Sequence, residues 1–477
     1  KYFVRDNRVV GLFIPDDNPQ RAEITKAPSA EELLANYKPQ GAAQKIEAFD
    51  SSFDNLDKRT QRIDIGDLNI ALLPKQTRGE TVTVCMKFKS GDEKNLFGKS
   101  SLQPVAAAML TRGTKTMTRS EIEDRMTELK MAGSITNFTT TRKNLPAALE
   151  LVFDVMHNSI MPQDEFDQFK KQMQVMIESM RDKPDALAQN AITQHFNTYP
   201  KGDPRHEYSL DESLEQLNRL TVDQVRAFYK EFGGTSRGEI SIVGDFDPKA
   251  VEKIIRDDYA KYVSKAHYAP IVTEYRPVQA TRVVIDTPDK ENATIVARSV
   301  FPINDTSPDA PALTVANWIL GGGTGLSNRL IERLRQKEGL SYGAGSHVRI
   351  PAKGDNGSFV FRAIVAPQNM LQAEASARDV IAKAIKDGFT DQEVEEAKKG
   401  LLQAMQVARS QDDVVARSWN DKMENQRTWV FSKKQAEAIS KLTTADVNAA
   451  LRKYIKPDEI TFVLAGDQKK AAQKKQD

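Results

Sequence analysis

Several features that mark other classes of protein are scarce or absent in this sequence of 477 residues. It has a single cysteine, Cys85, so no disulfide can form within the chain. Lys and Arg total 68 against 66 Asp and Glu, and the net charge of +2 gives no overall field to attract nucleic acid or an anionic membrane. The apolar stretch 145–160 is interrupted by Glu150, Asp154 and His157 and is shorter than the roughly 20 residues of a membrane span. We therefore expect neither a nucleic-acid partner nor a membrane.

Histidine is also scarce. The five histidines are His157, His195, His206, His267 and His347. No two of them have the spacing that would place two imidazoles on one helix face as zinc ligands. We expect no metal on this chain.

The composition that remains is that of a globular protein with sizeable cores. Hydrophobic residues make up 39% of the sequence and charged residues 28%, and the length suggests two to four domains. Cys85 lies in the alternating run 81–86, which predicts a strand and a structural thiol.

The pattern of the first 15 residues is typical of the end of a domain. They contain a strand-like apolar run, residues 9–14, followed by Pro15 and a polar stretch. We predict that residues 1–15 are the closing strand of an upstream domain and that residues 16–55 are a linker. The chain is then expected to be a fragment or a processed product.

An internal repeat is the strongest organisational signal. With an offset of 222 residues, Leu220, Thr221, Val225, Gly244 and Asp245 recur as Leu442, Thr443, Val447, Gly466 and Asp467. With an offset of 228 residues, Glu165, Phe166, Lys170 and Lys171 recur as Glu393, Val394, Lys398 and Lys399. The repeat predicts two copies of one domain.

Strand and helix patterns come in blocks within each copy. In the second copy, strands are predicted near 281–287, 294–301, 342–350, 357–365 and 460–464, and helices near 308–320, 327–337 and from 368 to about 454. This segregation predicts the α+β class, with helices packed on one face of a largely antiparallel sheet. The predicted domains are residues 56–268 and 277–467, joined by a connection containing Pro270 and Pro277 and followed by a charged tail, 468–477.

The most informative segment is a glycine-rich run, residues 321–325, followed by a helical pattern and the pair Arg335 and Tyr342. This segment resembles the pitrilysin/insulinase family of zinc peptidases. In that family a Gly-rich turn leads into a helix, and an Arg followed seven residues later by a Tyr lies in the half opposite the zinc. Lys337, Glu338 and Gly339 are also of the expected kind.

The resemblance implies that Arg335 and Tyr342 are catalytic residues that reach the scissile carbonyl of a peptide. A guanidinium and a phenolic O–H can stabilise the negative charge that hydrolysis places on that oxygen. The alternative to a catalytic role is that Arg335 is only a solvated helix residue and that Tyr342 is a strand residue whose ring packs against its neighbours.

The glycines of the run are predicted to have a role of their own. Gly322, Gly323 and Gly325 are predicted to bind the substrate backbone, with a tight turn as the alternative. The run lacks the Gly-Lys-Ser/Thr ending of a phosphate-binding loop.

The zinc motif of that family, an inverted His-x-x-Glu-His, is missing from the sequence. Residues 109–114 look like the stretch that follows it, so the motif would fall on residues 104–108, where its working side chains are replaced by Pro and Ala. Glu178 corresponds to the third ligand, but one carboxylate does not hold zinc, and we expect it to be solvated or salt-bridged.

The resemblance covers roughly residues 55–467 and implies the C-terminal half of a peptidase built from four such domains. Zinc would then be bound by a partner half that carries His-x-x-Glu-His, and this chain alone would be inactive. A periplasmic location is implied by the family's long bacterial members. Two alternatives stay open, which are a non-catalytic peptide-binding or scaffold subunit and an unrelated enzyme with an unrecognised cleft. Substrate preference and oligomeric state are not readable from the sequence.

Overall fold

The computed structural model describes residues 9, 11, 47–235, 237–323 and 328–472. Residues 47–472 lie in one compact unit. The strand predicted within residues 1–15 and most of the predicted linker fall outside the described residues, and a helix begins at Phe53. No described helix has the length and apolar character needed to cross a membrane.

The first half of this unit builds a six-stranded sheet with the order β1-β2-β6-β3-β5-β4. Its strands are β1 Gln61–Ile65, β2 Leu68–Pro74, β3 Thr81–Phe88, β4 Ala132–Gly133, β5 Asn137–Thr141 and β6 Gly238–Gly244. Its helices are α2 Phe53–Arg59, α3 Leu102–Met109, α4 Arg119–Glu128, α5 Leu145–Asn158, α6 Gln163–Glu178, α7 Pro184–His195, α8 Leu210–Arg219, α9 Val222–Phe232 and α10 Pro248–Asp257. Short 3₁₀ turns are η2 Arg78–Glu80, η3 Leu110–Arg112 and η4 Tyr259–Lys261.

The second half builds a five-stranded sheet with the order β7-β11-β8-β10-β9. Its strands are β7 Arg282–Asp286, β8 Ala293–Pro302, β9 Ser341–Arg349, β10 Asn356–Val365 and β11 Thr461–Gly466. Its helices are α11 Ala310–Asn317, α12 Arg329–Ile331, α13 Met370–Asp387, α14 Asp391–Ala408, α15 Asp412–Glu424, α16 Trp429–Lys441, α17 Thr444–Tyr454 and α18 Gln468–Ala472. The π-helical segments are η5 Trp318–Gly322 and η6 Glu332–Lys337, and the 3₁₀ turns are η7 Pro367–Asn369 and η8 Pro457–Glu459.

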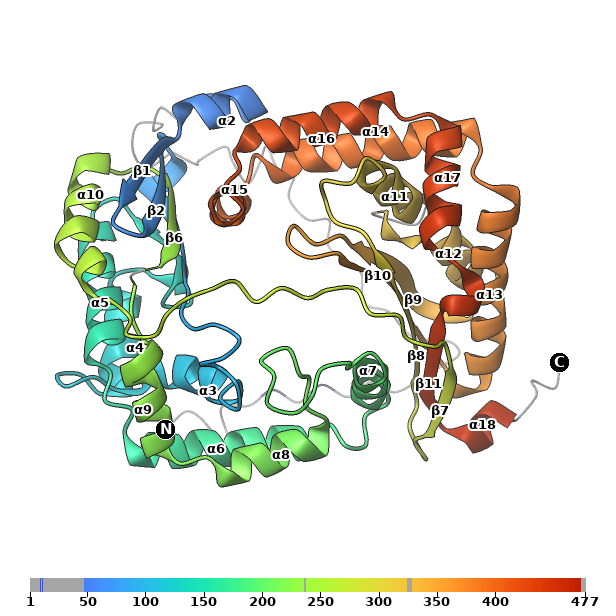
Figure 1. Cartoon of the computed structure of the whole chain (residues 1–477), viewed down its shortest axis with the longest axis horizontal. Helices are drawn as coiled ribbons and strands as arrows, with labels where there is room; N and C mark the ends of the chain where they lie inside the picture. Colours follow the sequence, from blue (N-terminus) through green and yellow to red (C-terminus); the bar gives the residue numbers. More distant parts are fainter. Residues whose placement is uncertain (1–8, 10, 12–46, 236, 324–327, 473–477) are drawn as a thin grey trace. The chain divides into compact units, whose positions relative to one another are not determined.

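Both sheets share a five-stranded topology, to which the first sheet adds the edge strand β1. In each, one parallel pair (β2 with β6, β7 with β11) is followed by antiparallel pairs (β6 with β3, β11 with β8) and by a further antiparallel hairpin-like extension. Helices and a hydrophobic core cover one face of each sheet, as Figure 1 shows for α13 and α17 on the second. The predicted α+β class is confirmed.

The repeated residues of the sequence have repeated structural roles. Thr221 and Thr443 are the N-caps of α9 and α17, each closed by a capping box. Lys170 in α6 and Lys398 in α14 donate to the carbonyl oxygens of Leu220 and Leu442 at 3.0 and 2.8 Å, which ties each long helix to the start of the helix that precedes the closing strand.

The repeated glycines end the strands β6 and β11 for a steric reason. A Cβ atom on Gly244 would lie 2.3 Å from the carbonyl oxygen of Thr81, and one on Gly466 would lie 2.5 Å from the Cβ atom of Ala293. Such contacts are too close for any side chain. The neighbouring strand, β3 or β8, therefore requires glycine at this position in both copies.

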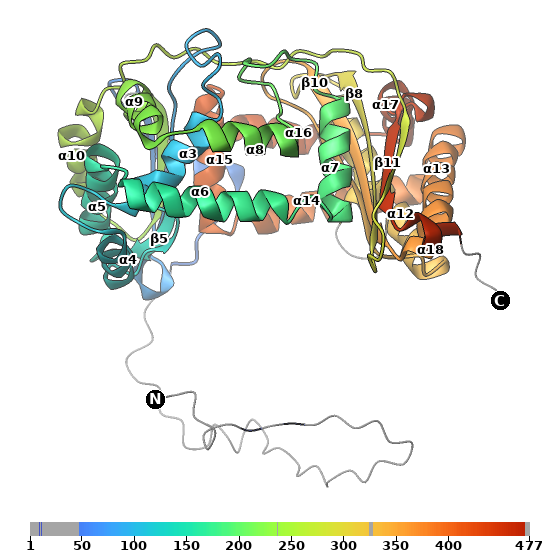
Figure 2. The same ribbon diagram turned by 90° about the horizontal axis from the view of Figure 1, so that it is seen from below.

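The two halves exchange one helix each, which the sequence did not predict. Helix α15 of the second half packs on the open face of the first sheet, where Trp419 joins Ala71, Leu73 and Val243 in a separate apolar cluster. Helix α7 of the first half packs on the second sheet (Figure 2), where its Ile192 joins an apolar cluster formed by residues of β8 and β11. Each exchanged helix follows the second long helix of its own half, α6 or α14.

Buried polar contacts fix α15 in its place. The Ser241 hydroxyl of β6 donates to the side-chain oxygen of Asn420, whose amide donates to the carbonyl oxygen of Cys85 at 3.1 Å. At the end of α15, Glu424 pairs with Lys87 of β3 at 2.5 Å. Buried polar groups satisfied in this way specify one position of the helix, because a shifted helix would leave them unpaired.

Removal of the Trp419 side chain is predicted to open this contact. Trp419 is fully buried, and burial raises the pKa of the nearby Cys85 thiol to about 11, so the thiol should react slowly at pH 8. Trp419→Ala should lower the free energy of unfolding by about 3–5 kcal/mol and raise the rate of Cys85 labelling by about tenfold or more. Val430→Ala, at an exposed site, is the control. Equal labelling rates in all three proteins would show that α15 does not protect Cys85.

Lys422 of α15 is predicted to make stability depend on pH. Burial, aided by Arg409 and Arg427, lowers its pKa from 10.5 to about 8. Between these values the unfolded chain binds more protons, so the free energy of unfolding should rise with pH. The rise in the free energy of unfolding should be about 1–3 kcal/mol. The ammonium lies 3.8 Å from the centre of the Trp429 ring, and this contact favours the charged form and therefore keeps the rise small.

Urea unfolding of the wild type and Lys422→Met at pH 7.5, 9 and 10.5 measures this effect. The difference in unfolding free energy between the two proteins should shift in favour of the wild type as the pH rises. A constant difference would contradict the assignment of the titration to Lys422.

Candidate functional site

The glycine-rich run continues from α11 through the π-helical segment η5. A Cβ atom on Gly322 would lie 2.3 Å from the Asn317 side-chain nitrogen, and one on Gly323 would lie 2.9 Å from the Trp318 carbonyl oxygen. Close packing therefore accounts for both glycines, as the turn interpretation requires. Their predicted substrate contacts stay a prediction, and Gly325 lies outside the described residues.

The segment that follows the run is held firmly. The buried Asn328 caps α12 by accepting from the Ile331 N–H at 2.9 Å, and its amide donates to the Gly323 carbonyl at 3.3 Å. Leu330 and Leu334 are fully buried beneath α12 and η6. These contacts fix the backbone from which Arg335 projects.

Arg335 is the unpaired cation of this segment. Its neighbours are paired, since Arg329 binds Glu393 at 2.7 Å, Arg333 pairs with Glu338, and Lys337 binds Glu332 at 2.8 Å. The Arg335 side chain is exposed and makes no hydrogen bond or ion pair with the described residues. It lies in the π-helical segment η6, and such segments are frequent at functional sites.

Tyr342 lies at an irregularity of strand β9. Ser341 is paired with Val365 and Gly343 with Ile364, so Tyr342 is an extra residue opposite β10, as in a β-bulge. Its side chain is 79% exposed. Strand β9 is the edge of its sheet, so the backbone beside Tyr342 has a free side among the described strands.

The sheet face that adjoins Tyr342 is basic, which the sequence did not predict. The registers place His347 and Arg349 of β9, Arg362 of β10 and Arg298 of β8 on the face that α7 partly covers. Burial lowers the pKa of Arg298, and the nearby Arg349 lowers it further. The alternation of these strands could have indicated the shared face, but only the register shows that the four side chains gather there.

The expected position of the zinc motif is occupied by helix α3. Residues 104–108 form its middle and offer no metal ligand, and no group of three His, Cys, Asp or Glu side chains suited to a metal exists among the described residues. Glu178 at the end of α6 is exposed and pairs with Arg181 at 3.0 Å, in agreement with the salt-bridged state expected for it. The residues present therefore do not fit zinc.

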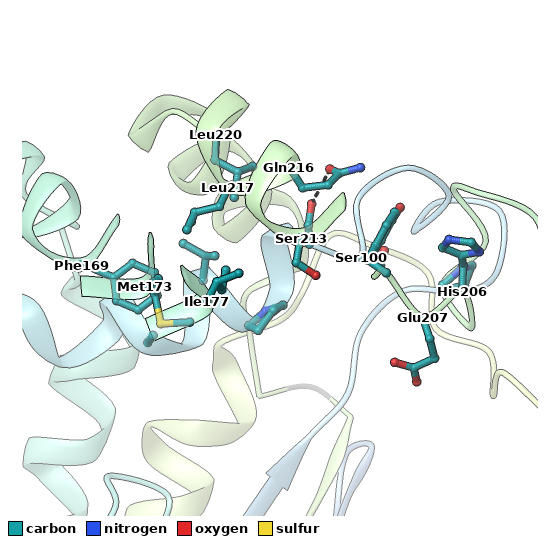
Figure 3. A pocket seen from close by; sticks show the side chains of 16 residues that line it. Ser100, Phe169, Met173, Ile177, His206, Glu207, Ser213, Gln216, Leu217 and Leu220 are labelled. Atoms are coloured by element: carbon teal, nitrogen blue, oxygen red, sulfur yellow. Dashed lines mark hydrogen bonds between the residues drawn. The ribbon is translucent and has the colours of Figure 1, made fainter. Parts of the chain in front are cut away.

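A pocket of about 560 Å³ lies beside Pro104, Val105 and Ala108, where the zinc motif was expected. It lies between α3, α6, α8 and the loops that contain Ser100 and His206, and we refer to it as the α3 pocket. Its apolar wall includes Val105, Ala108, Phe169, Met173, Ile177 and Leu217. Figure 3 shows the apolar side chains of α6 and α8 on one side and Ser100, His206 and Glu207 on the other.

The fold and the site together define a class of protein, an α+β unit of two similar halves with no group of side chains suited to a metal among its described residues. A peptidase M16 inactive domain from Pseudomonas fluorescens superimposes with a TM-score of 0.73, covering 85% of this chain and 97% of that one at 19% identity. The periplasmic protease PqqL from Escherichia coli gives a TM-score of 0.63, covering 92% of this chain and 51% of that one at 14% identity. Both likenesses establish the fold.

Residues 219–401 match the sequence profile of the peptidase M16 inactive domain. An uncharacterized zinc protease from Mycobacterium bovis is 25% identical over 261 residues, a match that spans 54% of this chain and 57% of the relative. Residues 219–401 are thus similar to the inactive domain of peptidase M16, in line with the pitrilysin/insulinase resemblance predicted from the segment with Arg335 and Tyr342. The match to the Mycobacterium bovis protein spans little more than half the length of that relative.

The lack of ligands at α3 predicts that the isolated chain holds no stoichiometric zinc. After incubation with zinc and extensive dialysis, elemental analysis should find well below one zinc per chain, because a catalytic zinc site needs about three protein ligands. Tightly held zinc at one per chain would contradict the reading of residues 104–108 as a lost motif.

Proposed function

We propose that this chain is the non-zinc-binding half of a zinc-dependent endopeptidase or oligopeptidase. It would close over a peptide and supply Arg335 and Tyr342 to the reaction, while a partner half with His-x-x-Glu-His binds the zinc. The observation that carries the proposal is the state of these two side chains. Both are exposed and unpartnered among the described residues, whereas Arg329, Arg333 and Lys337 around them are paired.

The chemistry of the two residues suits peptide hydrolysis. A phenolic O–H and a guanidinium donate hydrogen bonds to the oxygen of the scissile carbonyl as it gains negative charge. The face beside Tyr342 carries Arg349 and also Arg362, which pairs with Asp185 of α7 at 3.8 Å. The positive charge that is left on this face would raise the local potential and favour the same charge. The partner's zinc would supply the activated water, so this chain alone would be inactive.

Other parts of the proposal concern the whole protein. Residues 56–268 and 277–467 would be its two peptidase-like domains in this half, after the closing strand of an upstream domain in residues 1–15. Gly322, Gly323 and Gly325 would contact the substrate backbone. A periplasmic location is supported by the family resemblance and by the likeness to a periplasmic protease.

The test is hydrolysis of a quenched fluorescent peptide by this chain together with the His-x-x-Glu-His half. Tyr342→Phe and Arg335→Ala should each lower kcat on the order of a hundredfold, since each removes a donor to the developing charge. KM should change little because these contacts strengthen only in the transition state. The chain alone should be inactive.

Lys337→Ala is the matched control, since it removes an exposed cation from the same π-helical segment. Its rate should equal that of the wild type. Unchanged rates for Tyr342→Phe and Arg335→Ala would instead leave the chain as a peptide-binding or scaffold subunit. Hydrolysis by the chain alone would overturn the proposal entirely.

A further inference from the structure

The α3 pocket carries two buried polar groups that have no partner. The Ser100 hydroxyl oxygen and the Nε2 atom of His206 are both buried and make no hydrogen bond. Both residues line the polar end of the pocket (Figure 3). Buried polar atoms in folded proteins are almost always paired. A ligand that enters the pocket and displaces the atoms covering these two groups would supply the missing partners.

The tautomer of His206 indicates what kind of group is missing. Its Nδ1 atom lies 2.7 Å from the carbonyl oxygen of Tyr199, which only accepts hydrogen bonds. The amide nitrogen of Asn197 is farther away, at 3.3 Å, and already donates to the Glu207 carbonyl at 2.8 Å, so the shorter contact assigns the proton to Nδ1. In the neutral ring, Nε2 is then an acceptor. The matching ligand group is an N–H or O–H donor.

The charge of the pocket excludes anionic ligands. No Lys or Arg lines it, and the one ionisable acid of its lining is Glu207. A phosphate or carboxylate head group would find no cation to bind there and would meet this carboxylate. The rest of the wall is apolar, and Met173 supplies a flexible side chain that adapts to different shapes.

We propose that the α3 pocket binds an aliphatic or aromatic side chain of an extended peptide, whose main-chain N–H donates to Nε2 of His206. A volume of about 560 Å³ lies within the range of ligand pockets, roughly 300–1,000 Å³, and admits one large side chain with the backbone on either side. The position that lost the metal ligands would thus hold substrate instead of zinc. The inference deepens the proposed function, since it names a subsite for the peptide.

Direct binding to the 477-residue chain tests the pocket without hydrolysis. The probe is a fluorescein-labelled, unstructured Gly/Ser/Gln peptide with a single Leu, compared with the same peptide carrying Asp at that position. Fluorescence anisotropy should give a dissociation constant about tenfold or more lower for the Leu peptide, the gain expected from burying one leucine side chain. Equal affinities would overturn the proposal.

Two substitutions on α3 form a matched pair. Ala108 lines the pocket, and Ala108→Phe should fill it and abolish the preference for Leu, whereas the neighbouring Ala107 is exposed and outside the lining. Ala107→Phe should bind as the wild type does. His206→Ala should weaken both peptides, because the main-chain N–H loses its acceptor.

Methyl NMR of the wild type avoids any doubt about the folding of variants. Addition of the Leu peptide should shift the Met173 methyl signal, while the methyl signal of Met370, in the second core, should stay in place. No shift at Met173 would overturn the proposal. Tighter binding of decanoate than of the peptide would also overturn it, since the pocket would then be an acyl-chain site.

The outcome is separable from that of the proposed function. Loss of the Leu preference in Ala108→Phe together with normal hydrolysis in Tyr342→Phe would support the pocket and refute the catalytic role. Slow hydrolysis in Tyr342→Phe with no Leu preference in any protein would support the catalytic role and refute the pocket.

Discussion

The packing of α15 and α7 on each other's sheets is the contact on which the unit depends. The face of the first sheet that α15 covers carries Leu73, Cys85 and Val243, and the first half itself contributes Leu56 of the short helix α2 to this cluster. The second sheet presents Val296 and Val463 to α7 in the same way. Each half therefore covers apolar side chains of the other, which would be exposed to water without the exchanged helix.

The exchange also sets the arrangement of polar groups at the contact. Asn420 meets Ser241 and the Cys85 carbonyl, and Lys89 pairs with the buried Glu239 at 2.7 Å. Burial raises the pKa of Glu239, and the pairing with Lys89 opposes that rise. Such buried pairs contribute little net stability, yet they penalise every other docking of the helix. Apolar packing supplies the attraction, and these groups select one position.

The candidate catalytic pair lies where regular structure is interrupted on a rigid support. The π-helical segment with Arg335 is anchored by Leu334 beneath it, and the bulge at Tyr342 follows directly on the buried Leu340 and Ser341. An irregular backbone changes the direction of a side chain without loosening it. This combination suits residues that act on a ligand across an interface.

Much of the second half was predictable from the sequence, and the reasons are local. Strands and helices between residues 281 and 365 were predicted close to their observed bounds because alternation and glycine or proline punctuate each one. The repeated Thr221 and Thr443 proved to be capping residues, a role that needs only neighbours along the chain.

What the sequence did not reveal depends on contacts between distant segments. The apolar stripes of α7 and α15 give no indication of which sheet they cover. The bulge at Tyr342 follows from pairing with β10, and the basic face follows from the register of three strands. At α3, Pro104 and Ala108 predicted the loss of a zinc motif. The pocket could not be predicted in the same way, because the surrounding helices α6 and α8 form it.

The exchanged helices have a mechanical consequence. A helix that begins in one half and is embedded in the other links the two halves, and two such helices oppose a motion that would move the two sheets apart. Under the proposed function, a motion that admits a peptide would then take place between this unit and the partner half. The unit would then move as one rigid body, with the α3 pocket and Tyr342 at a fixed separation.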